Sequence, residues 1–176
     1  MDRHVISILV SNQAGVLSRI TGLFSRRCFN IDSLSVGVTE DPTISRITVV
    51  AFGDGEIIYQ IHKQLEKLED VCKVAELMPG ESVYRELALV KVNAQPYARS
   101  EIMSIAEIFR ANVIDVSSTT MTVEMTGAQK KIDAFIQLLS SYGVKEIART
   151  GLAGLQRGES LLKNDDANDD AQEEDL

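Results

Sequence analysis

The residues of this sequence best suited to chemistry form a short polar loop, Ser11-Asn12-Gln13-Ala14-Gly15. They suit binding and do not form a catalytic group. The loop follows an apolar strand expected at Val5–Val10 and opens directly into an amphipathic helix. The first turn of a helix has unpaired N–H groups and the positive end of the macrodipole. Glycine at position 15 lacks a Cβ, so an anion can approach the backbone closely. We therefore expect this corner to hold something small and anionic.

An α-amino acid matches the groups around this corner. Asn12 offers a side-chain carbonyl for the ammonium, and the Gly15–Leu17 backbone offers N–H donors for the carboxylate. Val16, Leu17 and Ile31 offer an apolar slot, and Asn30 is placed to reach a ligand from a neighbouring subunit. The alternative is a tight strand-to-helix turn, in which Asn and Gly serve only the backbone and Asn30 closes the helix.

Other kinds of site find little support in the sequence. We expect neither His4 nor His62 to bind a metal, and Ser100, Ser117 and Ser118 have no nearby histidine for a hydrolytic triad. The sequence contains no GxGxxG and no Walker-type GxxxxGK, so a nucleotide cradle is unsupported. The net charge of −8, the 5% aromatic content and the lack of Trp argue against nucleic-acid binding.

The cysteines and the charge distribution also limit the possibilities. Cys28 and Cys72 fall at apolar-periodic positions, and we expect two small buried thiols. From Lys163 to Leu176, seven acidic residues stand against one lysine, which predicts an acidic, disordered tail. No apolar run has the length of a signal peptide or of a spanning helix, so we expect a soluble, cytoplasmic protein without a membrane partner.

The apolar periodicity predicts the element order β-α-β-β-α-β twice. In the first half the helices are Val16–Phe24 and Glu56–Leu68, and the strands are Val5–Val10, Ile31–Val38, Ile44–Phe52 and Val71–Met78. In the second half the helices are Ser100–Phe109, with Ser100 as the expected N-cap, and Ala128–Ser140, and the strands are Glu86–Val92, Asn112–Ser117, Thr119–Thr126 and Val144–Arg149. In each half, the apolar stripes of both helices can be buried on one face of an antiparallel four-stranded sheet. The other face is then comparatively polar, and the edge strands are available for pairing.

The predicted fold class is therefore α+β, with tandem ferredoxin-like βαββαβ domains. We place the first ferredoxin-like domain, which contains the candidate binding corner, at residues 1–79, a second ferredoxin-like domain at 80–158 and the acidic tail at 159–176.

Several separated stretches of this sequence resemble one family in the same order. NQAGVLSRITGLFSRRCFNIDSLSV resembles the first segment of an ACT domain, a small regulatory module that binds amino acids. TEDPTISRITVV, QIHKQLEKLEDVCKVAEL, RELALVKV, EIFRANVIDV and GLAGLQRGE extend the likeness to the small regulatory subunit of acetohydroxyacid synthase (acetolactate synthase). The resemblance covers residues 5 to 158 and not the acidic extension.

The resemblance implies a regulatory subunit without catalytic residues, acting in branched-chain amino-acid biosynthesis. Its partner is a catalytic large subunit that uses thiamine diphosphate, Mg²⁺ and FAD. The family raises the activity of that subunit and confers feedback inhibition by valine or another branched-chain amino acid, bound where two ACT domains pair in a homodimer. The residues that carry over to this effector site are Asn12, Gln13, Ala14, Gly15, Val16 and Leu17 from one subunit, with Asn30 and Ile31 from the other.

Two alternatives remain open from the residues alone. One is a free-standing ACT-domain amino-acid sensor that controls a different enzyme or regulator. The other is a small enzyme in the same fold, against which stands the lack of a paired acid–base constellation.

Overall fold

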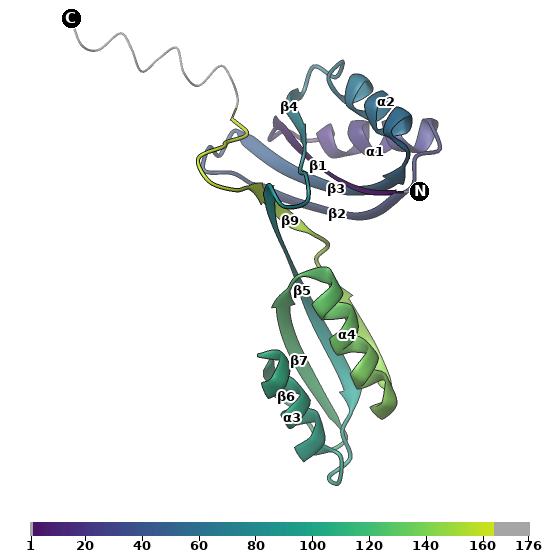
Figure 1. Ribbon diagram of the computed structural model, residues 1–176, viewed down its shortest axis with the longest axis vertical. Coiled ribbons are helices and arrows are strands. Elements are labelled where there is room, and N and C mark those ends of the chain that lie inside the picture. The colour runs from purple at the N-terminus through teal and green to yellow at the C-terminus, as the bar shows by residue number, and fades with distance from the viewer. Residues whose placement is uncertain (1, 164–176) are drawn as a thin grey trace, which may run out of the picture. The chain divides into compact units, whose positions relative to one another are not determined.

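Strands and helices alternate in the same order twice along residues 2–163, the part of the chain that the computed structural model describes (Figure 1). They form two compact units, one made of residues 2–83 and 154–163 and the other of Tyr84–Ala153. The elements of the first unit are β1 (Asp2–Ser11), α1 (Val16–Arg26), β2 (Ile31–Val38), β3 (Ile44–Gly53), α2 (Gly55–Leu65) and β4 (Val71–Glu76). Those that follow are β5 (Ser82–Asn93), α3 (Arg99–Phe109), β6 (Asn112–Val116), β7 (Thr120–Gly127), α4 (Gln129–Leu139), η1 (Ser140–Tyr142), β8 (Val144–Arg149) and β9 (Ala153–Gln156).

The first unit is an antiparallel sheet in the order β2-β3-β1-β4, with α1 and α2 side by side on one face (Figure 1). Alternate residues of β1 and β3 point toward the helices, and the apolar stripes of the helices close over them. The buried core is Ile6, Ile8, Val10, Val16, Ile20, Leu23, Phe24, Ile47, Val49, Ala51, Ile58, Ile61 and Leu65. The predicted α+β class and ferredoxin-like arrangement are thereby confirmed.

The other face of this sheet mixes polar side chains, among them Ser7 and Thr48, with apolar ones, and its centre is buried. Val5, Leu9 and Val50 on this face are 5%, 3% and 0% exposed. The reason lies in the central run Val5–Val10 of β1, in which every residue but Ser7 is apolar, as in strands covered on both faces. The C-terminal segment 154–163 belongs to this unit, and the carbonyl oxygen of Leu162 accepts a hydrogen bond from Arg46 of β3 at 3.4 Å.

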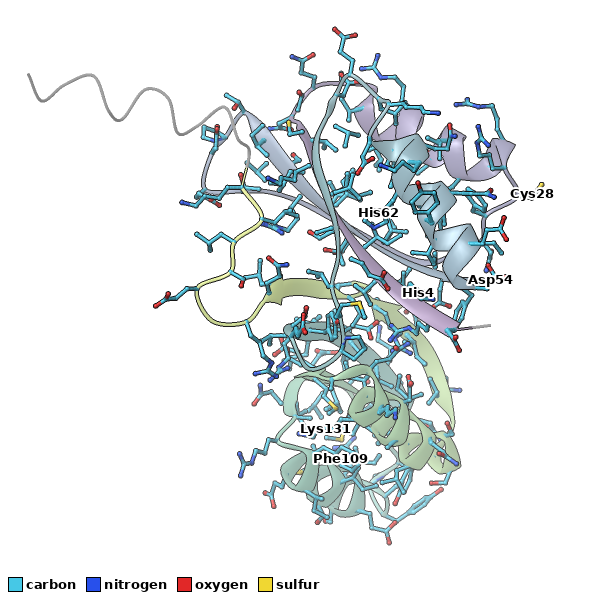
Figure 2. All side chains as sticks on the ribbon, turned by 45° about the horizontal axis from the view of Figure 1, so that its top comes forward. His4, Cys28, Asp54, His62, Phe109 and Lys131 are labelled. Atoms are coloured by element: carbon cyan, nitrogen blue, oxygen red, sulfur yellow. The ribbon has the colours of Figure 1, made fainter. Side chains whose placement is uncertain are left out.

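The end of α1 exposes a cysteine that we expected to be buried. Phe29 N–H donates to the carbonyl of Phe24 at 3.0 Å, which closes the helix and places Cys28 in the left-handed region with φ +56°. A side chain at this position points away from the helix, and Cys28 is exposed at the rim of the unit (Figure 2). The expectation is therefore wrong for Cys28, whereas Cys72 is half-buried.

The second unit repeats the topology as β6-β7-β5-β8, with its own core between the sheet and two helices. Its buried core is Ala88, Val90, Val92, Ala94, Ala98, Ile102, Ala106, Met121, Val123, Met125, Ile132, Phe135 and Leu139. Arg149 of β8 donates to both carboxylate oxygens of Glu86 at 2.8 and 2.7 Å, and to Asp133 of α4 at 2.9 Å. This ion-pair group joins two strands to a helix, and it holds the pKa of Arg149 above its ordinary value.

Some predicted boundaries differ from the structure. Helix α3 begins at Arg99 with Ala98 as N-cap, so Ser100 lies inside the helix and the predicted Ser100 cap is wrong. The turn that precedes it, in which Ala98 N–H donates to Gln95 at 2.8 Å, already starts the helical path. Helix α2 ends at Leu65, not Leu68.

A short strand, β9, lies near the C-terminal end of the described residues, and the sequence does not reveal it. β9 was not predicted, and residues 159–163, placed in the acidic tail, are described as part of the first unit. The prediction of a disordered tail from residue 164 onward lies outside the described residues. Among the described helices, none has the length and apolar character required to cross a membrane.

Candidate functional site

The corner between β1 and α1 presents an open helix N-terminus. Gly15 is the N-cap residue, with φ +89° and ψ −14°, and no side chain caps the helix. The first intrahelical bond runs from Arg19 N–H to the Gly15 carbonyl at 3.1 Å, so the amides of residues 17 and 18 precede it. A Cβ built on Gly15 meets no described atom within 4 Å. The space over the helix start is therefore free for a ligand, and the positive φ favours glycine.

Asn12, in the loop that leads into this corner, has a fixed amide. Its Nδ2 donates to the carbonyl of Pro42 at 2.9 Å, and its backbone N–H donates to the carbonyl of Thr43 at 2.7 Å. Both partners belong to the turn between β2 and β3. Because Nδ2 is engaged, Oδ1 is the amide atom that remains to accept a hydrogen bond from a cation.

The charges nearest the corner are arranged in a pair. Arg19 Nε lies 2.7 Å from Asp70 Oδ2, and the carbonyl of Asp70 accepts from Ser11 N–H at 2.9 Å. The Asp70 side chain is 18% exposed, whereas that of Arg19 is 55% exposed. The pair ties the loop to the segment before β4 and offsets the Arg19 charge, so the helix N-terminus supplies most of the local attraction for an anion.

The structure brings Asn12 through Leu17 together, with different roles for their side chains. Asn12, Gln13, Ala14 and Gly15 are exposed, and Leu17 is 41% exposed. Val16 is only 2% exposed, so its side chain belongs to the core and only its backbone faces the corner. The apolar surface beside the corner is thus Leu17 and not Val16.

Asn30 and Ile31 lie at the opposite end of α1 from this corner. The helix has 11 residues, which makes it about 16 Å long. Ile31 pairs with Ala51 at one end of β3, whereas Asn12 contacts the turn just before Ile44 at the other end. Within one chain, the structure does not bring Asn30 or Ile31 to Asn12.

The two histidines line a separate hollow of about 360 Å³ beneath α2. His4 Nδ1 lies 2.6 Å from Glu76 Oε1, and Figure 2 shows His4 on β1 and His62 on α2. Across residues 2–163, we find no group of three or more His, Cys, Asp or Glu side chains arranged to hold a metal ion.

Comparisons with known proteins place both units in one family. The family described as "AHAS small subunit-like ACT domain" matches residues 6–73, and "Small subunit of acetolactate synthase" matches residues 85–158. The acetolactate synthase small subunit of Bacillus subtilis is 49% identical over 157 residues, covering 89% of this chain and 91% of its own. The isozyme 3 small subunit of Escherichia coli is 44% identical over 162 residues, covering 92% and 99%. The chain belongs to the acetolactate synthase small-subunit family.

A solved structure agrees with this assignment. The acetolactate synthase small subunit from Thermotoga maritima is 42% identical, with a TM-score of 0.85, and the match covers 91% of this chain and 100% of that one. The resemblance inferred from the sequence is confirmed. Family membership makes the chain a regulatory subunit that carries an ACT domain in its first unit.

The turn of residues 39–43 also borders the corner. Its Pro42 and Thr43 carbonyls accept hydrogen bonds from the side-chain amide and the backbone N–H of Asn12. The signal for this turn was present in Asp41-Pro42-Thr43, because an aspartate two residues before a threonine commonly closes an Asx turn. The sequence alone does not show that this turn lies against the β1–α1 loop.

Proposed function

We propose that this chain binds branched-chain amino acids, valine foremost, at the β1–α1 corner and thereby inhibits a catalytic large subunit that it otherwise activates. The observation that carries the proposal is the uncapped helix start at Gly15 beside the fixed amide of Asn12. The amides of the helix start suit a carboxylate, and Asn12 Oδ1 suits an ammonium. The side chain of Leu17 supplies an exposed apolar surface for the rest of the ligand.

The edge strand β2 supports a site shared by two copies of the chain. Val36 and Val38 of β2 are 47% and 59% exposed. Asp32 is the only charged residue in β2, whereas the other edge strand, β4, carries Lys73 and Glu76. Charged side chains protect a sheet edge from pairing, so β2 is the edge that suits a second copy.

Antiparallel pairing of two β2 strands would also complete the effector site. It would bring the Ile31 end of one strand to the Val38 end of the other. The Val38 end leads into the turn that contacts Asn12, so Asn30 and Ile31 of the second copy would approach the corner of the first. This arrangement accounts for a site whose residues lie at opposite ends of α1 in one chain.

The mechanism follows from binding linkage. Valine bound between two ACT domains would stabilise one arrangement of the regulatory dimer, and that arrangement holds the catalytic subunit in a less active state. Valine acts only through its different affinity for the two arrangements, with a coupling of about 1–3 kcal/mol. In this proposal the chemistry belongs to the large subunit, with its thiamine diphosphate, Mg²⁺ and FAD.

The test is the variant Gly15→Asp, assayed by calorimetry with valine and by co-purification with the catalytic subunit. A carboxylate placed where the ligand carboxylate binds should weaken valine binding more than about a hundredfold. Aspartate tolerates the left-handed region better than most residues, so the fold should survive at a cost of about 1 kcal/mol. The catalytic subunit should still be activated but no longer inhibited by valine.

Tyr97→Asp is the matched control, because Tyr97 occupies the corresponding corner of the second unit and is 85% exposed. It should leave valine binding unchanged. Normal valine binding by the Gly15→Asp variant would refute the site, and a wild-type chain that stays monomeric at high concentration would refute the shared arrangement.

A further inference from the structure

The turn between β2 and β3 is closed by its own side chains. Asp41 Oδ1 accepts from Thr43 N–H at 2.8 Å and from the Thr43 hydroxyl at 2.7 Å. These two hydrogen bonds hold the pKa of the Asp41 carboxyl below its ordinary value, and the bond from the Thr43 hydroxyl has the larger effect. The Thr39 hydroxyl donates to the Asp41 carbonyl at 3.0 Å, and Ile44 N–H donates to the same carbonyl at 3.0 Å. The turn is therefore a preformed element and not a loose connection.

One side of this turn fixes the amide of Asn12. The carbonyls of Pro42 and Thr43 follow each other in the chain and accept the side-chain and backbone N–H groups of Asn12. Without the Pro42 carbonyl, the amide is free to rotate by half a turn. The NH₂ group would then face the position proposed for the ligand ammonium, and two donors cannot bond each other.

The other side of the turn borders the C-terminal segment of the same unit. Residues 39–41 line a hollow of about 170 Å³ together with Leu162 and Lys163. Arg46 of β3 also lines it, donating to Ser7 Oγ at 2.9 Å and to the Leu162 carbonyl at 3.4 Å. Burial lowers the pKa of Arg46, and the negative charge of Glu40 opposes that effect. The turn thus lies between the effector corner and segment 154–163.

We propose that the turn of residues 39–43 positions Asn12 for the effector and couples the effector corner to segment 154–163. The inference rests on the proposed function, because it assigns a role in binding the same effector. Asp41 is a positioning residue in this scheme: it touches no ligand and acts by holding the Pro42 carbonyl against Asn12.

The first test compares Asp41→Ala with Asp41→Asn in the full chain, by valine titration calorimetry. Alanine removes the acceptor that closes the turn, and we expect valine binding to weaken about tenfold, the effect of losing one net hydrogen bond. Asparagine keeps an Oδ1 acceptor, so its affinity should stay within about twofold of wild type.

A double variant separates positioning from a general loss of structure. If Asp41 acts through Asn12, adding Asp41→Ala to Asn12→Ala should weaken binding no further than Asn12→Ala alone. Additive losses in the double variant would overturn the positioning role.

Hydrogen exchange with and without valine tests the coupling. We expect valine to slow exchange in peptides covering residues 39–44 and 154–163 as well as 10–17, and Asp41→Ala to remove the effect at 154–163. Protection confined to residues 10–17 would overturn the coupling.

The outcomes distinguish this inference from the proposed function. If wild-type chain binds no valine, both fail. If wild type binds, Asn12→Ala weakens binding and Asp41→Ala binds as wild type does, the effector site stands and the role of the turn is refuted.

Discussion

The β1–α1 corner of the first unit and the β5–α3 corner of the second have the same backbone scaffold. Asn12 N–H donates to the Thr43 carbonyl at 2.7 Å, and Ala94 N–H donates to the Thr119 carbonyl at the same distance. One residue earlier in each unit, a backbone N–H donates to a carbonyl of the segment leading into the last strand, Ser11 to Asp70 and Asn93 to Gly143. The two corners therefore correspond residue by residue.

The side chains at the two corners differ in what they leave open. The second unit has Ala94 where the first has Asn12, and Tyr97 where the first has Gly15. Its corner is closed by Arg99, which donates to the carbonyls of Ala94, Ser117 and Ser118 at 3.2, 2.8 and 2.7 Å. In the first unit a glycine and an amide thus leave the helix start open, whereas in the second unit the guanidinium of Arg99 occupies the corresponding corner.

The largest effect that we expect concerns the stability of the second unit alone. Arg149→Met removes both donors to Glu86, a carboxylate in a residue that is only 5% exposed. Breaking a buried ion pair costs roughly 3 kcal/mol, because the remaining charge is left unpaired. Urea denaturation monitored by hydrogen exchange should show that the loss of stability falls within residues 84–153. Valine binding should be unchanged.

The control for this variant is Lys91→Met, in the same unit. Lys91 Nζ lies 4.0 Å from Glu146 and both side chains are exposed, so the change should be less than about 0.5 kcal/mol. Equal losses from Arg149→Met and Lys91→Met would show that burial of Glu86 does not determine the outcome.

A paired substitution at the two corners sharpens the contrast between them. Arg99→Ala leaves three carbonyls without their donor and should destabilise the second unit by about 2 kcal/mol without affecting valine binding. Asn12→Ala removes one exposed hydrogen bond and should cost less than about 1 kcal/mol of stability, but it should weaken valine binding at least about tenfold. Denaturation and calorimetry on both variants measure the two effects. If Arg99→Ala weakens valine binding as much as Asn12→Ala does, the functional distinction between the corners is wrong.

The smallest expected effect is a pH dependence of the first unit, which contains His62. Burial lowers the pKa of His62, opposed by the charges of Glu76 and Glu66 and reinforced by Lys63. The folded state therefore binds its proton less readily than the unfolded chain. This contribution to stability is present above the ordinary histidine pKa of 6.5 and is lost as pH falls below it.

Denaturation between pH 7.5 and about 5 measures this effect, which should be smaller than the losses expected for Arg149→Met and Arg99→Ala. His62→Gln should flatten the pH dependence of the first unit and leave that of the second unchanged. An unaltered slope in His62→Gln would show that other groups produce the dependence.

The fold could be predicted from the sequence because local signals agreed with the tertiary arrangement. The richness in β-branched residues indicated β3, and the stripe of Ile20, Leu23 and Phe24 indicated the face of α1 that packs on the sheet. The predictions failed where a long-range contact decides the outcome. The apolar run Val5–Val10 is typical of a strand covered on both faces, but it does not show which segment covers the second face, and the four-residue β9 has no periodicity to detect.

The candidate corner was predicted in part for the same reason. Gly15 at a helix start is a local feature, and the structure places it as the N-cap. The turn at residues 39–43 and the closure of the second corner by Arg99 depend on contacts between segments 18 to 30 residues apart, which a single sequence does not display. Whether Asn30 and Ile31 join the corner stays a prediction, because it depends on a second copy.

The division of the first unit into two pieces of chain has a consequence for anyone who wishes to dissect this protein genetically. A stop codon after residue 153 would delete residues 154–163 from the first unit, and with them most of β9 and the Leu162 carbonyl that accepts a hydrogen bond from Arg46. An N-terminal fragment ending near residue 80 would lack the same segment. A faithful minimal ACT unit would need residues 2–83 expressed with 154–163 supplied through a short artificial linker.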